Sequence, residues 1–156
     1  MNDTGWDADT QSADLVLFNA RLVTPTAELM GGIALRNGRI AALGPHLPDQ
    51  GGAAGHSDDC EGDYLIPGIV DLHTDHVERH SLPRAHVRWD ADQALAAHDG
   101  VVISGGTTTV FDSLCVGASV QHPERREMLA PLVDAIERGV AEHRFRAEHL
   151  IHLRCE

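Results

Sequence analysis

Residues 67–76, PGIVDLHTDH, decide the fold of this chain. The Pro-Gly pair breaks the preceding structure, and the apolar positions after it predict a buried strand. Successive side chains of a strand point to opposite faces, so the acids and the imidazole share one face and the apolar residues share the other. The polar set is Asp71, His73 and Asp75; the other set, which we expect to pack against a helix layer, is Val70, Leu72 and Thr74.

The polar face of this strand is typical of a metal site. An isolated charge in a protein core is very costly, and a divalent cation removes that cost by binding the charged side chains. Imidazole and carboxylate together suit zinc, manganese or iron. We therefore predict that His73 and Asp75 bind a metal ion. The alternative is a hydrogen-bonded pair at the end of a strand.

The residues after this strand alternate between helix and strand patterns. The expected elements are a helix over about 91–104 capped by Asp90, a strand over 107–112, a helix over about 124–143 that Pro131 kinks or restarts, and a strand over 149–156. Strands separated by helices pair in parallel through right-handed crossovers, so the fold class is α/β. Because no helix follows the third strand, we expect the chain to be a piece of a longer protein.

The residues before this part predict a small β module. Asn37-Gly38 separates two apolar runs, and both residues tolerate positive φ, which is a strong hairpin signal. The expected divisions of the chain are a disordered lead-in over 1–13, the β module over 14–66 with a flexible loop over 45–63, and the α/β part over 67–156.

Composition excludes several classes of function. The 156 residues carry a formal net charge of -12, which argues against a nucleic-acid partner, and no apolar run is long enough to span a membrane. All 12 basic residues are Arg, so Schiff-base chemistry, a P-loop and a lysine-derived metal bridge are excluded, while bidentate Arg–phosphate binding stays open. Cys60, Cys115 and Cys155 fit neither a zinc site nor a disulfide framework, which indicates free thiols in a reducing cytoplasm.

Polar residues also gather at the ends of the other predicted strands. Asp112 ends the second strand, and His152, Arg154 and Glu156 alternate on one face of the third. Functional side chains of parallel α/β proteins collect at the carboxyl ends of the strands. We therefore expect Asp112 and Glu156 at the same edge of the sheet as the two predicted metal ligands.

Several segments resemble a known family. The Pro-Gly-x-x-Asp-x-His pattern after a β module resembles the amidohydrolase superfamily, and segments 72–75, 97–99, 106–112 and 146–156 resemble its α-D-ribose 1-methylphosphonate 5-triphosphate diphosphatases. The resemblance implies a small β-sandwich module followed by the first three strands and two helices of a TIM (β/α)8 barrel, here truncated. It also implies release of diphosphate from the 5-triphosphate in phosphonate catabolism, within the carbon–phosphorus lyase pathway.

The resemblance further implies a site for two divalent ions, of zinc, manganese or iron. In this hypothesis His73 and Asp75 bind the first ion, and Glu156 takes a bridging or second position. Asp71 is a catalytic acid that orients a ligand, and Asp112 either acts in the same way or caps a loop. The predicted substrate-binding residues are Arg84, Arg154 and His152, with a core polar contact as the alternative for His152.

Two other functions stay open on the sequence. One is a different amidohydrolase that acts on amides or aminated bases, and the other is an inactive truncated remnant. The expected partners are a phosphorylated ribosyl phosphonate as substrate and, at the exposed edge of an open sheet, a second copy of the chain or other phosphonate-pathway proteins.

Overall fold

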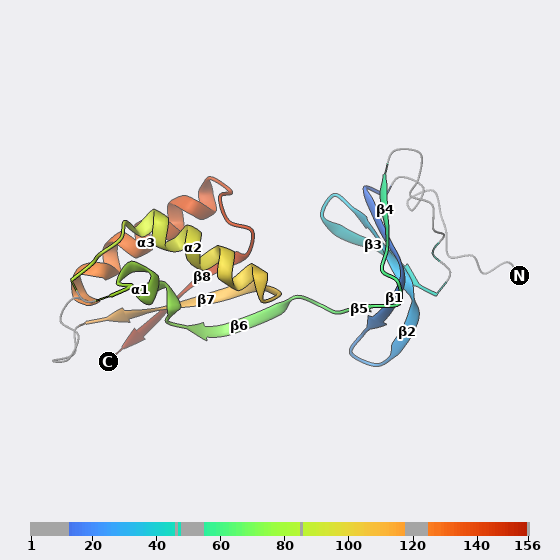
Figure 1. The fold of residues 1–156 in the computed structure, drawn as a ribbon, viewed down its shortest axis with the longest axis horizontal. Helices are drawn as coiled ribbons and strands as arrows, with labels where there is room; N and C mark the ends of the chain where they lie inside the picture. Colours follow the sequence, from blue (N-terminus) through green and yellow to red (C-terminus); the bar gives the residue numbers. More distant parts are fainter. Residues whose placement is uncertain (1–12, 46, 48–54, 85, 118–124, 156) are drawn as a thin grey trace, which may run out of the picture. The chain divides into compact units, whose positions relative to one another are not determined.

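The protein, described here by a computed structural model over residues 13–45, 47, 55–84, 86–117 and 125–155, divides into two compact units (Figure 1). The strands of the first unit, Met1–Pro67, are β1 (Leu15–Val23), β2 (Glu28–Arg36), β3 (Arg39–Gly44), β4 (His56–Asp59) and β5 (Tyr64–Leu65). They form a sheet of order β3-β2-β1-β4, in which β5 also pairs with β1. The described residues of this unit hold this one sheet, so the sandwich implied by the resemblance is not seen among them.

Local signals build most of this sheet. Asn37 and Gly38 link β2 to β3 with φ values of 51° and 70°, as a two-residue turn between antiparallel strands requires. The predicted hairpin is therefore confirmed. Ala13, Val16 and Ala34 form a small buried core, so the expected disordered lead-in does not include Ala13. Residues 1–12 lie outside the described part of the chain.

Strand β4 lies inside the segment for which the sequence predicted a flexible loop. Its four residues pair in parallel with the start of β1, and Asn19 Nδ2 donates a hydrogen bond to Asp59 Oδ1 at 2.8 Å. The polar run HSDD carries no strand pattern of its own. It forms a strand because backbone hydrogen bonds to β1 hold it at the edge of the sheet. The loop prediction is wrong for 56–59, and residues 46 and 48–54 lie outside the described part.

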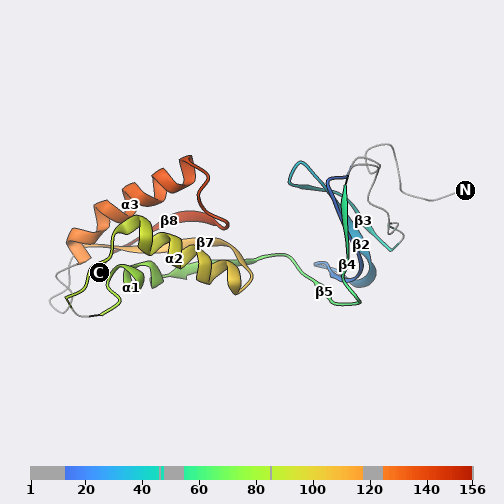
Figure 2. The same ribbon diagram turned by 45° about the horizontal axis from the view of Figure 1, so that its top comes forward.

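The second unit, Gly68–Glu156, is a parallel sheet with helices on one face (Figures 1 and 2). Its elements are β6 (Ile69–Thr74), α1 (His76–Ser81), α2 (Ala91–Ser104), β7 (Thr107–Val116), α3 (Arg125–Ala141) and β8 (Glu148–Cys155). The strand order is β6-β7-β8. The helix predicted over 91–104 is confirmed, and the Asp90 side chain caps it by accepting the N–H groups of Asp92 and Gln93. No described helix is long and apolar enough to cross a membrane.

Three details of this unit differ from the sequence prediction. The segment after β6 contains the short helix α1 in place of a loop, and α3 runs from Arg125 straight through Pro131, which is therefore not its start. Val70 and Leu72, expected against a helix layer, are 52% and 67% exposed. The described helices pack chiefly over β7 and β8, so the edge strand β6 keeps these apolar side chains uncovered.

Candidate active site

Side chains of β7 alternate between the two faces of the parallel sheet. Leu114 packs in the core beneath the helices, so its neighbour Ser113 points to the opposite face, which we call the open face. There Ser113 Oγ lies 3.0 Å from His73 Nδ1 of β6 and 3.4 Å from His152 Nδ1 of β8. The two imidazole rings meet edge to face, with centroids 5.3 Å apart. Three neighbouring strands thus each bring one polar side chain to the open face.

Asp75 and Arg154 add a carboxylate and a guanidinium to this group. Asp75 occupies the N-cap position of α1, yet its side chain makes no capping bond and instead meets Arg154 Nη1 at 3.4 Å. Burial acts to raise the pKa of the Asp75 carboxyl, but a backbone hydrogen bond and the Arg154 guanidinium together hold that pKa below its usual value. The carboxylate is therefore ionised at neutral pH. His73, Asp75, Ser113, His152 and Arg154 are called the open-face cluster below.

The other predicted site residues have different placements. Asp71 is half-buried, and its Oδ1 accepts the backbone N–H of His73 at 3.1 Å, which braces the chain next to that imidazole. Arg84 is exposed in the loop after α1, in an isolated bridge with Val87, and no hydrogen bond or ion pair among the described residues joins it to the open-face cluster. Glu156 lies outside the described residues.

Asp112 lies on the opposite, helix-covered face. Its Oδ1 is 2.9 Å from His98 Nε2 of α2, and its Oδ2 is 2.7 Å from His149 Nδ1 of β8. His149 Nε2 in turn lies 3.4 Å from Asp99 Oδ1, which also accepts the N–H groups of two residues that lead into β8. These four buried side chains are called the buried network. The structure does not bring Asp112 together with His73 and Asp75, because its side chain points to the opposite face from that of Ser113. The prediction that Asp112 ends the strand is wrong, since β7 continues to Val116.

Charge in the buried network is balanced by direct contact. Burial acts to raise the pKa of Asp112, but hydrogen bonds from His149 and His98 hold it below its usual value. Burial acts to lower the pKa of His149, but the carboxylates of Asp112 and then Asp99 raise it above its usual value. A buried charge is tolerated when it is paired and hydrogen-bonded in this way. The network therefore ties α2 to both β7 and β8.

Among the described residues, three ligand atoms of the kind that bind a divalent metal come close together in the buried network, whereas the open-face cluster offers such side chains without a close group of three. The ligand atoms of His98, Asp112 and His149 lie within 4.8 Å of one another, but each imidazole meets a different Asp112 oxygen at hydrogen-bond length, so hydrogen bonding accounts for that set. On the open face, His73 has Nδ1 bonded to a hydroxyl oxygen, and Asp75 supplies an ionised carboxylate. A histidine anchored through one ring nitrogen can bind a metal through the other, so the residue types of the open-face cluster are those that suit a metal.

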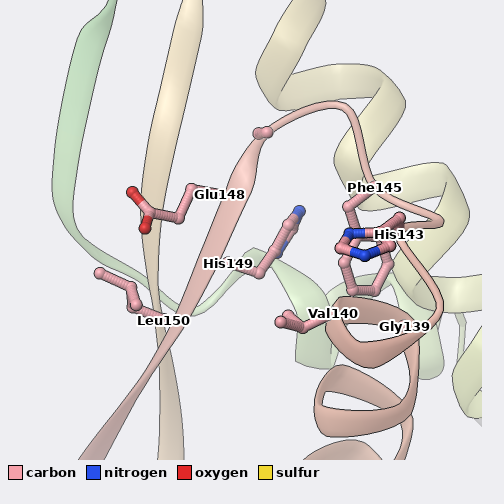
Figure 3. A pocket seen from close by; sticks show the side chains of 8 residues that line it. Gly139, Val140, His143, Phe145, Glu148, His149 and Leu150 are labelled. Carbon is pink, nitrogen blue, oxygen red and sulfur yellow. The ribbon is translucent and has the colours of Figure 1, made fainter. Parts of the chain in front are cut away.

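A cavity of about 230 Å³ lies on the helix-covered side, where the end of α3 meets the start of β8 (Figure 3). Its lining includes Gly139, His143, Phe145, Glu148 and His149, and the Phe145 ring lies 4.4 Å from that of His149. The nitrogens of His149 already face Asp112 and Asp99. The candidate active site is therefore on the open face and not in this cavity.

Comparison with known proteins finds hydrolases. The chain is 34% identical over 145 residues to the α-D-ribose 1-methylphosphonate 5-triphosphate diphosphatase of Escherichia coli (strain K12), a match that covers 91% of this chain and 36% of that protein. It is 32% identical over 99 residues to the D-hydantoinase of Rhizobium radiobacter, which covers 64% of this chain and 20% of that protein. No family model matches the chain.

Solved structures share the fold. The L-hydantoinase (dihydropyrimidinase) from Arthrobacter aurescens has a TM-score of 0.55 at 20% identity, over 89% of this chain and 27% of that one. A D-hydantoinase has a TM-score of 0.51 at 24% identity, over 88% of this chain and 26% of that one. The predicted resemblance to hydrolases of the amidohydrolase superfamily is confirmed. Within it, the predicted resemblance to the ribosyl triphosphate diphosphatase family is confirmed, and the chain spans 36% of that relative's length.

Sequence reasoning missed Ser113, Asp99 and the role of His149. Strand alternation could have predicted the faces of Ser113 and His149. Ser113 is the neighbour of Asp112 and so points to the opposite face, and His149 shares its face with the apolar Ile151. Asp99 carried no such signal, because its role depends on a backbone turn far away in sequence that meets the middle of α2.

Proposed function

We propose that this chain carries the metal-binding strands of a hydrolase that cleaves the 5-triphosphate of α-D-ribose 1-methylphosphonate 5-triphosphate and releases diphosphate. The observation that supports it best is the open-face cluster, in which Ser113 contacts the His73 imidazole and the Asp75 carboxylate meets the Arg154 guanidinium. The imidazole and the carboxylate suit a divalent cation, and the guanidinium suits phosphoryl oxygens. The diphosphatase relative from Escherichia coli supports the same substrate class.

Three residues of the cluster, together with Glu156 and Asp71, then have proposed roles. His73 and Asp75 would hold a divalent cation of zinc, manganese or iron, and Glu156 would take a bridging or second position; when bound, such ions would acidify a water and neutralise phosphoryl charge. Arg154 lies against Asp75 and can donate to a phosphoryl oxygen from the same position. Asp71 holds the backbone of His73, which limits the movement of the imidazole.

The test is diphosphate release by the purified protein, including any coding sequence that continues beyond residue 156. We expect release from the ribosyl triphosphate when the protein is loaded with manganese or zinc. Arg154→Gln should weaken substrate binding, whereas Arg138→Gln, which removes an exposed arginine paired with Asp92 on the helix side, should leave activity unchanged. No release with zinc, manganese or iron would refute the proposal.

A second candidate is hydrolysis of a cyclic amide or deamination of a base. The similarity to hydantoinases in both sequence and fold favours it. Asp75 and the guanidinium beside it count against it, because neither amides nor bases carry the anionic charge that Arg154 is suited to bind. A panel of cyclic amides and aminated bases, assayed with the same metal-loaded protein, separates the two candidates.

We also infer a cytoplasmic location. No disulfide joins Cys60, Cys115 and Cys155, as expected in a reducing compartment. Association with a second copy of the chain or with other phosphonate-pathway proteins is a further proposal, and light scattering of the purified protein tests the first of these.

A further inference from the structure

Ser113 contacts two imidazoles through a single hydroxyl group. Its side chain is fully buried, and its Oγ lies 3.0 Å from His73 Nδ1 and 3.4 Å from His152 Nδ1. A hydroxyl group has one proton to donate and lone pairs that accept. Both histidines present the same ring nitrogen, so the Ser113 proton can serve only one of them. The other imidazole must act as the donor for both contacts to be hydrogen bonds.

This sharing makes the two histidines chemically different. A neutral imidazole that donates from Nδ1 has a bare Nε2, whereas one that accepts at Nδ1 carries its proton on Nε2. A bare Nε2 binds metal, and a protonated Nε2 donates a hydrogen bond. We infer that Ser113 is a positioning residue that gives His73 and His152 opposite tautomers, so that His73 binds metal through Nε2 and His152 donates from Nε2 to a phosphoryl oxygen of the substrate.

The surroundings of each imidazole ring decide which histidine donates to Ser113 and which accepts. This assignment rests on the function proposed above. His73 lies two residues before Asp75, and a metal-bound histidine normally donates its other N–H to an oxygen, here Ser113 Oγ. His152 lies two residues before Arg154 on the same face of β8, so an N–H and a guanidinium are available together for an anionic group. The open face thus divides into a metal-binding side and an anion-binding side.

The first experiment reads the tautomers directly in the metal-free 156-residue chain. Long-range ¹H–¹⁵N correlation spectra recorded near pH 8, where an ordinary imidazole is neutral, distinguish a protonated from a bare ring nitrogen. We expect His73 protonated on Nδ1 and His152 protonated on Nε2. Added inorganic triphosphate should shift the His152 Nε2 signal more than any signal of His73. The same tautomer on both rings, or the reverse assignment, overturns the inference.

The second experiment removes the hydroxyl. Ser113→Ala should lose the fixed tautomer of both rings and bind Mn²⁺ about 10- to 100-fold more weakly, as expected when the hydrogen-bond partner of a metal-ligating histidine is removed. Ser81→Ala is the matched control, because Ser81 is also buried but its Oγ has no hydrogen-bond partner among the described residues. Unchanged tautomers and unchanged Mn²⁺ affinity in a folded Ser113→Ala would refute the inference.

These readouts are independent of the diphosphatase assay. A protein with opposite tautomers and no diphosphate release would retain the role of Ser113 and reject the proposed substrate. A protein that releases diphosphate with both histidines in one tautomer would support the proposed substrate and reject the role of Ser113. Should Ser113→Ala fail to fold, the wild-type spectrum alone decides the question.

Discussion

The open-face cluster and the buried network use the same side-chain types on opposite faces of one three-stranded sheet. In the buried network both oxygens of Asp112 are bonded to imidazoles, and every member is shielded by helices. In the open-face cluster the Asp75 carboxylate meets one guanidinium at 3.4 Å and stays partly exposed. A buried carboxylate with a hydrogen bond on each oxygen makes a structural brace, whereas an ionised acid at a partly exposed position suits a metal ligand.

The comparison predicts its largest effect at Asp112. Asp112→Ala leaves two buried histidines without their shared partner, so we expect a loss of about 3–5 kcal/mol in the free energy of unfolding. Asp92→Ala is the control, since Asp92 bonds two arginines near the surface and should cost about 1 kcal/mol or less. Urea unfolding followed by circular dichroism measures both. Equal losses in the two variants would mean that the buried network does not stabilise the fold.

Substitution of His73 should affect metal binding strongly and stability weakly, the reverse of what we expect for Asp112. His73→Gln removes the predicted ligand, so Mn²⁺ affinity should fall by more than about 100-fold, beyond the roughly 10- to 100-fold loss typical of a supporting residue. The free energy of unfolding should change by only about 0.5 kcal/mol, because the side chain is exposed. Equilibrium dialysis and urea unfolding give the two numbers. Full metal binding by His73→Gln would remove this residue from the site.

Substitution of Glu78, which lies in α1, should have an intermediate effect. Its Oε1 accepts the N–H of Cys115 at 3.2 Å, and its Oε2 lies 3.1 Å from Arg125 Nε, so it ties α1 to β7 and α3. Glu78→Gln keeps an acceptor but loses the charge, and we expect a cost of about 1.5 kcal/mol in unfolding free energy. Because α1 begins directly after Asp75, Mn²⁺ affinity should also weaken slightly. Glu137→Gln changes an exposed glutamate of α3 in the same way, and it is the control for loss of charge alone.

The smallest expected effect is on the pH dependence of stability. The folded pKa of His149 is raised above its unfolded value, so its contribution is fully present below about pH 6.5 and is lost as the pH rises through the folded pKa. The folded pKa of Asp112 is lowered, so its contribution is present above about pH 4 and is lost as the pH falls through the folded value. Urea unfolding of the wild type at a series of pH values should show the loss of stability as the pH rises through the folded pKa of His149. His149→Gln should not show this loss. The same slope in His149→Gln would assign the effect to another group.

Local signals predicted much of this fold. The Asp90 cap and the helix it starts, and the turn at Asn37-Gly38, follow from side-chain and φ preferences of a few neighbouring residues, and both are confirmed. Helix α1 and strand β4 were missed, because each is held by a partner distant in sequence: α1 through Glu78 and Cys115, and β4 through its backbone bonds to β1. Short elements of this kind have too few residues to carry a periodic pattern.

The sequence by itself determined which side chains share a face only where a strand is regular. Alternation is a property of the local backbone, so the shared parity of His152 and Arg154 in β8 could be read without any structure. In β6 a register irregularity between Asp71 and Thr74 breaks the alternation, and Asp75 lies beyond the end of the strand. Only the tertiary structure decided which face the helices cover, because that depends on contacts between α2, β7 and β8. That coverage makes Asp112 part of a buried brace, and it leaves Ser113, one residue further on, between the two histidines of the open face.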